Sequence, residues 1–382
     1  MKAIVGVMLA PYVSSFIFDC ATAILGLTIP IYAYNLGASA FDIGLIGASG
    51  GLAYTLTAVV FGRISDRIGR RRPLLASSII LAAVTICYSL IKDYLLLAPL
   101  NAVQSLALGI FWPNMEGFVA SHATPMGIRR ALQCYNISWS LGWIAGPILG
   151  GLLIGLYPSE YVFYAVSIFF FAGFVFLGTL SKEPNLPVTR NGDIRTSQHQ
   201  RIRPGVFILA YGVAFVFALT TRTQGSLFPA YAASLGLDAL LIGEIVFFVG
   251  LARTITFGLM GILERRLRRP LIFLGPLLLT TSMAIFFTGG EPWHFALACM
   301  VLGLGSGISY FSSLSMVLEG ADDTLGLRAG LFEGMIGVGS VLGPFLGGLV
   351  SMANPRYPYA LAGLICVLVL FYQVIVWLRW RT

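Results

Sequence analysis

The sequence predicts an all-α integral membrane protein with twelve transmembrane helices in two pseudo-symmetric six-helix bundles. Of the 382 residues, 57% are hydrophobic and only 10% are charged, whereas a soluble domain carries about 25% charged residues. Apolar runs of about 20 residues, long enough to cross the hydrocarbon layer as helices, recur along the whole chain. The second half of the chain also repeats the first.

Glycine, proline and charge clusters separate the expected spans, and most connections are short. The twelve spans are 8–34, 41–62, 73–91, 94–121, 130–156, 160–180, 205–233, 239–263, 270–289, 293–319, 327–352 and 357–378. The long polar segment Ser181–Pro204 is the exception among the connections. We therefore expect a first bundle in 1–180, a cytoplasmic linker in 181–204 and a second bundle in 205–382.

The positive charges predict the orientation. With cytoplasmic termini, 20 of the 24 Lys and Arg residues lie on the inner side, against Lys92 and Arg356 outside and Arg222 and Arg253 within spans. This positive-inside bias predicts a multi-pass protein of the cell membrane with both termini in the cytoplasm. It also accounts for the net charge of +8 without a nucleic-acid partner, and we expect a monomer surrounded by lipid.

Three blocks of the first half recur in the second half in the same order, at shifts of 199, 198 and 197 residues. The pairs are Ile29–Gly44 with Phe228–Gly243, Asp66–Arg71 with Glu264–Arg269, and Gly142–Gly151 with Gly339–Gly348. Because each half has an even number of spans, the halves share one topology and an axis along the membrane normal relates them. This predicts a substrate site between the bundles and alternating access by rocking.

The loop after the second span reads GRISDRIGRR and matches a G-x-x-x-D-R-x-G-R-R signature. With twelve spans and a central loop, the chain resembles the major facilitator superfamily of secondary transporters over essentially its full length. The residues of the match are Gly62, Asp66, Arg67, Gly69, Arg70 and Arg71. The resemblance implies that they form an inner gate with Glu333, whose alternative role is substrate contact.

A glycine row in the fifth span resembles the family's antiporter motif, which is typical of drug and metabolite exporters. The row and its repeat in the eleventh span are Gly142, Gly146, Pro147 and Gly150, and Gly339, Gly343, Pro344 and Gly347. Glycines four residues apart let another backbone approach closely, and proline can bend the helix. Tight packing alone is the alternative. The arginine of the exporter signature in the fourth span is absent, because Asn101 stands there.

Five ionisable side chains lie inside spans, where a charge is costly and usually faces a partner or a wet cavity. They are Asp19, Glu116, Arg222, Arg253 and Glu333. Asp19 and Glu116 are interpreted as a proton site or, alternatively, as groups in hydrogen bonds or in ion pairs with the two arginines. Arg222 has no charged counterpart in the first half and either binds an anionic group or pairs with the acids. For Arg253 we favour a structural role.

Polar and aromatic residues on the inner spans are candidates for the lining of the site. They are Gln104, Asn136 and Gln224, with Trp112, Asn114, Tyr135, Trp139 and Tyr310. Aromatic surfaces suit amphiphilic or cationic compounds, whereas Arg222 suits anions.

The chain has no nucleotide-binding loop, no metal-ligand cluster and no catalytic constellation, so we expect no cofactor, no metal and no enzyme. A membrane enzyme would need such a constellation, and a sensor would need an appended soluble domain. The leading hypothesis is a secondary active transporter that exports drugs or metabolites in exchange for protons. Uptake or facilitated diffusion of a small organic solute without proton antiport is the alternative.

Overall fold

The computed structural model describes residues 2–122, 128–178, 204–262, 270–318 and 325–381. In this part of the chain it has twelve long α-helices, one short 3₁₀ helix and no strand. The helices are α1 Lys2–Asn35, α2 Ala40–Ile68, α3 Arg71–Leu90, η1 Tyr94–Leu96, α4 Leu97–Ser121, α5 Ile128–Leu156, α6 Ser159–Gly178, α7 Pro204–Ser234, α8 Ala239–Ile262, α10 Leu271–Thr288, α11 Pro292–Leu318, α12 Leu325–Ser351 and α13 Tyr357–Arg381. The predicted linker 181–204 lies outside the described residues, apart from its last residue.

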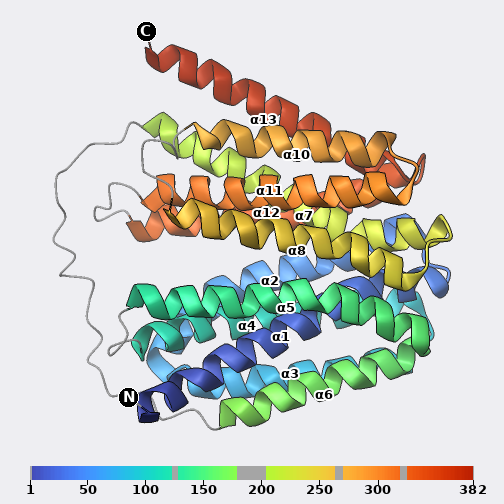
Figure 1. The fold of residues 1–382 in the computed structure, drawn as a ribbon, viewed down its shortest axis with the longest axis vertical. Helices are drawn as coiled ribbons and strands as arrows, with labels where there is room; N and C mark the ends of the chain where they lie inside the picture. Colours follow the sequence, from blue (N-terminus) through green and yellow to red (C-terminus); the bar gives the residue numbers. More distant parts are fainter. Residues whose placement is uncertain (1, 123–127, 179–203, 263–269, 319–324, 382) are drawn as a thin grey trace.

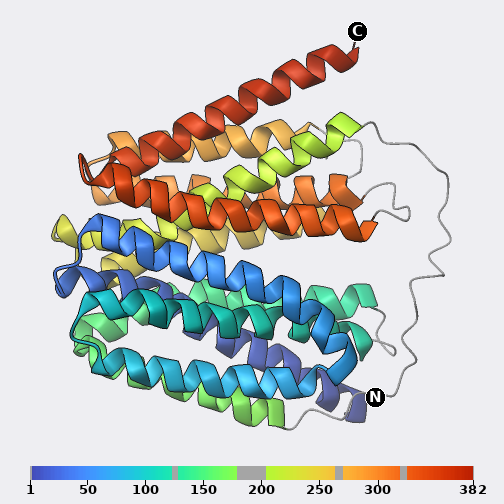
Figure 2. The same cartoon turned by 180° about the vertical axis from the view of Figure 1, so that it is seen from behind.

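The helices form two bundles that lie side by side, α1 to α6 in one and α7 to α13 in the other (Figures 1 and 2). Both chain termini lie at the same end of the molecule, which we call the terminal end, and the opposite end is the far end. We call the two groups the N-bundle and the C-bundle. The predicted architecture of two six-helix bundles is therefore confirmed.

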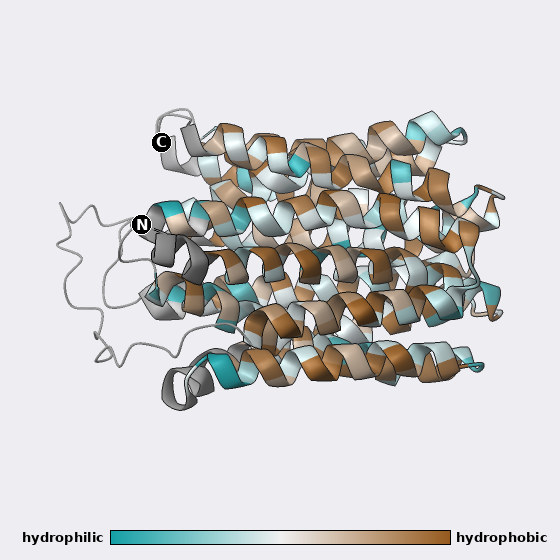
Figure 3. Cartoon of the chain, turned by 60° about the horizontal axis from the view of Figure 1, so that its bottom comes forward, coloured by the Kyte–Doolittle hydropathy of each residue, from teal (hydrophilic) through white to brown (hydrophobic). Residues whose placement is uncertain are grey.

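The helices are apolar along most of their length, and hydrophilic residues gather at their two ends (Figure 3). Within the residues that the structure describes, ten of the helices are long and apolar enough to cross a membrane by length and composition.

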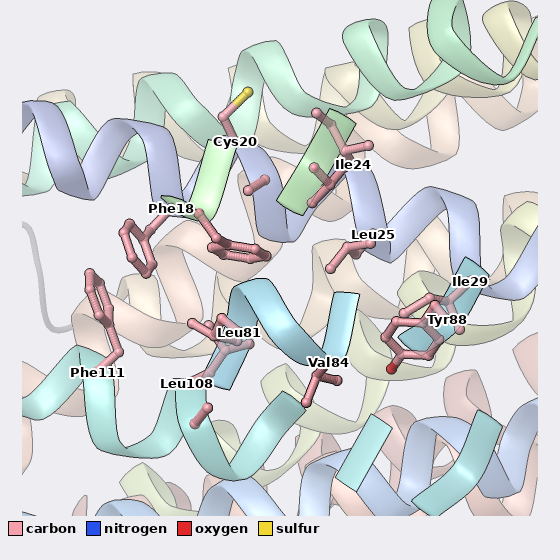
Figure 4. Packing of buried hydrophobic residues seen from close by; sticks show 14 of the residues in the cluster. Phe18, Cys20, Ile24, Leu25, Ile29, Leu81, Val84, Tyr88, Leu108 and Phe111 are labelled. Carbon is pink, nitrogen blue, oxygen red and sulfur yellow. The ribbon is translucent and has the colours of Figure 1, made fainter. Parts of the chain in front are cut away.

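Aromatic packing holds the N-bundle together (Figure 4). Phe18 on α1 is fully buried, stacks on Phe111 of α4 at 4.0 Å between ring centroids, and meets Phe170 of α6 edge-on at 5.3 Å. Each such pair contributes about 0.5–1.5 kcal/mol beyond its buried area. Consecutive helix positions point about 100° apart, so this packing turns the next residue, Asp19, away from the bundle core.

The repeat is visible in the turns at the far end. Gly37 and Gly236 follow α1 and α7 with φ of 88° and 82°, a region that glycine adopts without strain. Ser39 Oγ then caps α2 by accepting from the Asp42 backbone N–H at 3.2 Å, and Asp42 accepts in return from the Ser39 N–H at 2.9 Å. At the repeat position of Ser39, Asp238 Oδ1 caps α8 by accepting from the Leu241 N–H at 2.9 Å. The same glycine turn and helix cap therefore start α2 and α8.

The bundles touch at the far end through glycine contacts along two helix pairs. On α2, a Cβ placed on Gly44 would lie 2.5 Å from the Pro344 carbonyl oxygen of α12, and one on Gly51 would lie 2.6 Å from the Ser340 carbonyl oxygen. On α8, a Cβ on Gly243 would meet the Pro147 carbonyl oxygen of α5. The blocks recognised as repeats thus pair crosswise, α2 with α12 and α8 with α5.

Glycines nearer the terminal end of the same helices have open space instead. A Cβ on Gly258 of α8, or on Gly330 or Gly334 of α12, would meet no atom within 4 Å. The glycine contacts between the bundles are therefore close at the far end, whereas these three glycines nearer the terminal end touch no neighbouring helix.

Candidate functional site

Five charged side chains and three tyrosines on eight different helices interact electrostatically in the space between the bundles. They are Asp19 on α1, Tyr54 on α2, Glu116 on α4, Tyr135 on α5, Arg222 on α7, Arg253 on α8, Tyr310 on α11 and Glu333 on α12. Arg222 is exposed although it lies in the middle of α7. Because its electrostatic partners, Tyr54 and Asp19, belong to the N-bundle, its exposed surface faces the other bundle. We call this space the chamber.

We call the limit of the chamber toward the far end its ceiling, and the part toward the terminal end that contains Glu116 and Glu333 its mouth. Gly26 of α1 and Gly225 of α7, which are repeat mates, are exposed, and a Cβ on either glycine would meet no atom within 4 Å. Both lie about 13 Å from the far ends of their helices, at a rise of 1.5 Å per residue. Glu116 and Glu333 lie about 28 and 27 Å from the far ends of theirs. Measured along the helices, the charged groups therefore lie within about 15 Å of the two glycines, on their terminal-end side.

One acid and two arginines lie in the deep part of the chamber. Asp19 is 5% exposed, its Oδ2 has no hydrogen-bond partner within the described residues, and it interacts electrostatically with Arg253 and then Arg222. Arg253 donates from Nε to Ser306 Oγ at 3.1 Å and lies 5.8 Å from the Trp143 ring centroid. This cation–π contact joins α8 to α5 across the bundle boundary.

The two remaining acids lie at the mouth, one on each bundle. Glu116 and Glu333 are both exposed, and Glu333 interacts electrostatically with Glu116. Within the described part of the chain neither carboxylate forms a hydrogen bond or an ion pair. Glu116 and Glu333 therefore lie within electrostatic range of each other, and Asp19 lies within electrostatic range of the two arginines; the proton site and the ion-pair role both stay predictions.

Aromatic rings cross between the bundles near the mouth. Trp139 of α5 meets Phe257 of α8 at 6.3 Å between centroids, and Phe257 meets Tyr310 of α11 at 6.1 Å. Tyr310 in turn packs on Phe217 and Phe332 at 5.4 and 6.0 Å. Asn136 is exposed one turn before Trp139 and accepts a hydrogen bond from the indole Nε1 at 3.1 Å. The chamber thus combines fixed charges with an apolar aromatic wall.

Two of the predicted site residues lie apart from the charged groups. Gln104 is buried about 10 Å from the far end of α4, well beyond the level of Arg222. Gln224 is buried between α7 and α11, where its Nε2 contacts the Cys299 sulfur at 3.9 Å. A separate apolar cavity of about 360 Å³ lies between α7, α12 and α13. No charged residue lines it, so it suits an acyl chain rather than a polar solute.

Comparisons with known proteins agree with this geometry. The family model described as "Major Facilitator Superfamily" matches residues 12–324 and 210–382. The chain belongs to the Major Facilitator Superfamily. Among curated proteins it is 26% identical over 365 residues to "MFS-type transporter SLC18B1" of Mus musculus, covering 86% of this chain and 76% of the relative. It is 22% identical to "Multidrug resistance protein MdtG" of Salmonella paratyphi C, covering 96% and 93%.

Solved structures share the fold. The nucleoside transporter NupG superposes with a TM-score of 0.75 at 16% identity, covering 97% of this chain and 99% of NupG. A POT family transporter superposes with a TM-score of 0.76 at 14% identity, covering 98% and 96%. Family, fold and relatives identify the chain as a multi-pass membrane transporter of a small solute.

The antiporter-like glycine row of this transporter packs against α1. A Cβ on Gly142 would lie 2.5 Å from the Phe16 carbonyl oxygen, and one on Gly146 would lie 2.7 Å from the Cys20 carbonyl oxygen. The row on α12 packs in the same way against α7, where a Cβ on Gly339 would lie 2.5 Å from the Phe215 carbonyl oxygen. The remaining glycines of the two rows face the same partner helices; they are Gly150, Gly343 and Gly347. Both rows therefore serve close helix packing, whatever else they do.

The described part of the signature loop binds within the N-bundle. Gly69 has φ of 80°, which lets the chain turn sharply between α2 and α3. Arg70 donates from Nη1 to the Gly117 carbonyl oxygen of α4 at 2.9 Å, and Arg71 from Nη2 to the Gly178 carbonyl oxygen of α6 at 2.9 Å. The side chains of Gly62, Asp66 and Arg67 lie outside the described residues, so their gating role stays a prediction.

Tyr54, Trp143 and Ser306 are site residues that sequence reasoning missed. Tyr54 interacts electrostatically with Glu333, Arg222, Glu116 and Asp19, and so lies between the two charged levels. Its position in the glycine-rich run GASGGLAYTL of α2 was the available signal, because such a helix face is one where another helix approaches closely. Trp143 and Ser306 carry no signal that separates them from packed residues.

Proposed function

We propose that this transporter exports small amphiphilic compounds from the cell in exchange for protons. In this proposal it works as a monomer in the cell membrane with both termini in the cytoplasm. The positive-inside bias then assigns the terminal end to the cytoplasm, and the structure corresponds to a state that is closed on the outside. MdtG relatives, named multidrug resistance proteins, support the export direction through similarity over almost the whole chain.

The buried Asp19 carboxylate is the observation that carries the proposal. A carboxylate in a poorly solvated site favours its protonated form, whereas nearby arginines favour the charged form. Asp19 has both kinds of neighbour and an oxygen without a hydrogen bond in the described structure. In this proposal the Asp19 carboxylate takes up and releases a proton as the arginines move relative to it. Glu116, which is exposed at the mouth, offers a second place for a proton.

Proton flux tests this function directly. Cells that lack or overproduce the protein are first grown with a panel of toxic compounds, and a compound whose tolerance rises is taken forward. Proteoliposomes with an imposed pH gradient should then move that compound against the proton flow, and Asp19→Asn should abolish the gradient-driven component. Glu160→Gln, which removes an exposed acid of the far end, is the matched control. Flux that ignores both the gradient and the Asp19 substitution would contradict the proposal.

Facilitated movement without proton antiport is the second candidate, and one observation favours it. Asn101 occupies the position of the exporter arginine, and its Nδ2 donates to the Ile46 carbonyl oxygen of α2 at 2.7 Å. The residue therefore packs α4 on α2 and carries no charge for coupling. In the same proteoliposomes, this alternative predicts equal flux in both directions, driven only by the compound's own concentration difference.

A further inference from the structure

The deep part of the chamber and its mouth carry opposite formal charge. Arg222 and Arg253 with Asp19 give the deep part a net +1, whereas Glu116 and Glu333 give the mouth −2. The two arginines differ in their contacts. Arg253 is held by Ser306 and Trp143. Arg222 is exposed, and within the described residues it makes no hydrogen bond or ion pair. A guanidinium has five N–H donors, so Arg222 is the cation that can take up an anionic group.

The mouth needs a positive charge for the opposite reason. Two exposed carboxylates within electrostatic range of each other repel when both are ionised, and a cation bound between them relieves the repulsion. One carboxylate belongs to each bundle, so a bound cation also connects the two moving parts. The hydroxyl groups of Tyr54 and Tyr310 lie within electrostatic range of both acids.

An independent observation points to an incoming donor in the same chamber. Oδ2 of Asp19 is buried, the residue is 5% exposed, and the oxygen accepts no hydrogen bond in the described part of the chain. Tyr54 and Tyr135 lie within electrostatic range of this carboxylate, so it belongs to the same cluster as the mouth acids. A buried acceptor without a donor is rare in a folded protein.

Arg222 and the mouth acids are separated along the membrane normal. Arg222 lies about 18 Å from the far end of α7, and Glu333 and Glu116 lie about 27 and 28 Å from the far ends of α12 and α4. The offset is therefore about 9–10 Å, and Arg253 and Asp19 lie between these levels, about 21 and 24 Å from the far ends of α8 and α1. The aromatic row of Trp139, Phe257 and Tyr310 lies at the level of the mouth acids, about 26–27 Å from the far ends of its helices.

We propose that the chamber binds dipolar amphiphiles, which carry a carboxylate or another oxyanion at one end and an ammonium group at the other. The anionic end accepts hydrogen bonds from Arg222, the ammonium end donates to Glu116 and Glu333, and the apolar carbons next to the ammonium group pack on the aromatic row. This inference rests on the proposed transport function, since it assigns the substrate class of the same chamber. A dipolar substrate also explains why one chamber contains aromatic and acidic groups, which bind cations, together with an arginine, which binds anions.

Equilibrium binding to the purified protein tests the inference without any gradient. The probes are 8-aminooctanoate, whose extended chain is comparable in length to the offset, and two singly charged compounds of the same length, octanoate and octylamine. The dipolar probe forms charge-assisted hydrogen bonds at both ends, whereas each single-charge probe forms them at one end. The dipolar probe should therefore bind about 10- to 100-fold tighter than either single-charge probe. Intrinsic tryptophan fluorescence or calorimetry measures the affinities.

Substitutions then assign each end of the probe. Arg222→Gln should reduce the affinity for 8-aminooctanoate to that of octylamine and leave octylamine binding unchanged. Glu333→Gln should weaken 8-aminooctanoate and octylamine together and spare octanoate. Lys92→Gln and Glu160→Gln, which remove one charge each from an exposed ion pair of 2.6 Å at the far end, are matched controls. Thermal unfolding of each variant confirms that it is folded.

Several outcomes would overturn the inference. They are octylamine or octanoate binding as tightly as 8-aminooctanoate, no detectable binding of 8-aminooctanoate, or an Arg222→Gln variant that is folded and keeps full preference for the dipolar probe. Proton-driven flux is measured separately, so the two proposals fail separately. Flux of a monocation with no dipolar preference would reject only the substrate class, whereas dipolar preference without gradient-driven flux would reject only proton-coupled export.

Discussion

Adding one methyl group at Gly243 should open the far end of the protein. The Cβ of alanine would meet the Pro147 carbonyl oxygen and lie 3.3 Å from the Gly151 Cα, both on α5. These are backbone atoms of a packed helix, so they cannot yield as a flexible side chain does. Overpacking of this kind costs about 1–3 kcal/mol. If only the state closed at the far end bears that cost, Gly243→Ala shifts the balance toward the open state by about 5- to 150-fold.

Spin labels on the two bundles measure this shift. Tyr157 at the end of α5 and Leu235 at the end of α7 are exposed at the far end, and both can be replaced by labelled cysteines once Cys87 and Cys134, the cysteines that are not buried, are serines. Gly258→Ala on the same helix is the control, because its Cβ has no atom within 4 Å. Both substitutions gain the same helix propensity, about 1 kcal/mol, so their difference isolates the contact.

An unchanged distance distribution in Gly243→Ala, or equal broadening in Gly258→Ala, would refute this prediction. Either result would mean that the far-end glycine contacts do not determine which state is populated. A loss of folding in Gly243→Ala alone would show instead that the α5–α8 contact stabilises every state, and melting curves of both variants reveal this case.

Three further predictions follow from the chamber. Gly225→Leu fills open space at the ceiling, so the free energy of unfolding should change by no more than about 0.5 kcal/mol, while the KM of a transported compound rises. An unchanged KM would place Gly225 outside the substrate path. Arg253→Met loses the charge-assisted hydrogen bond to Ser306 and should lower the free energy of unfolding by about 1.5–3 kcal/mol. Lys92→Met, at an exposed site, should not destabilise the protein. Equal destabilisation by the two substitutions would exclude a buried structural role for Arg253. Asp19→Asn removes the charge that Arg253 faces across the bundle boundary and should shift the spin-label distances toward the open state by about 5- to 30-fold, or 1–2 kcal/mol; identical distances at all pH values would separate Asp19 from the conformational change.

The repeat and the helix count could be read from the sequence because both depend on local patterns. Hydrophobic length predicted the spans, including α7, in which the polar run TTRTQGS lies mid-helix. The Leu-Gly and Gly-Pro blocks marked the turns and contacts that the structure shows at the far end. Their crosswise pairing, with Gly44 against Pro344 and Gly243 against Pro147, could not be read from the sequence, because the repeat says which segments are alike and not which of them touch.

The candidate site could be predicted residue by residue but not as an arrangement. Intramembrane charge is a strong signal, and it marks all five charged residues of the chamber, which are Asp19, Glu116, Arg222, Arg253 and Glu333. Their grouping depends on the rotation of each helix about its own axis, and no periodic pattern fixes that rotation in a helix that is apolar on every side. Hence the sequence could not show that Glu116 of the N-bundle lies within electrostatic range of Glu333 of the C-bundle.

The glycine packing of α5 and the charged groups meet at Gly142 and Trp143. This arrangement suggests how the proposed proton binding is linked to the proposed rocking of the bundles. One face of α5 is fixed to α1, where a Cβ on Gly142 would lie 3.1 Å from the Asp19 Cβ. Another face meets the C-bundle through Gly151 and through Trp143, on which Arg253 lies. Arg253 therefore has its ring partner on α5 and its acidic partner on α1. In the proposed mechanism, rocking of α8 against α5 changes the distance from Arg253 to both partners and so couples the charge on Asp19 to the position of the C-bundle.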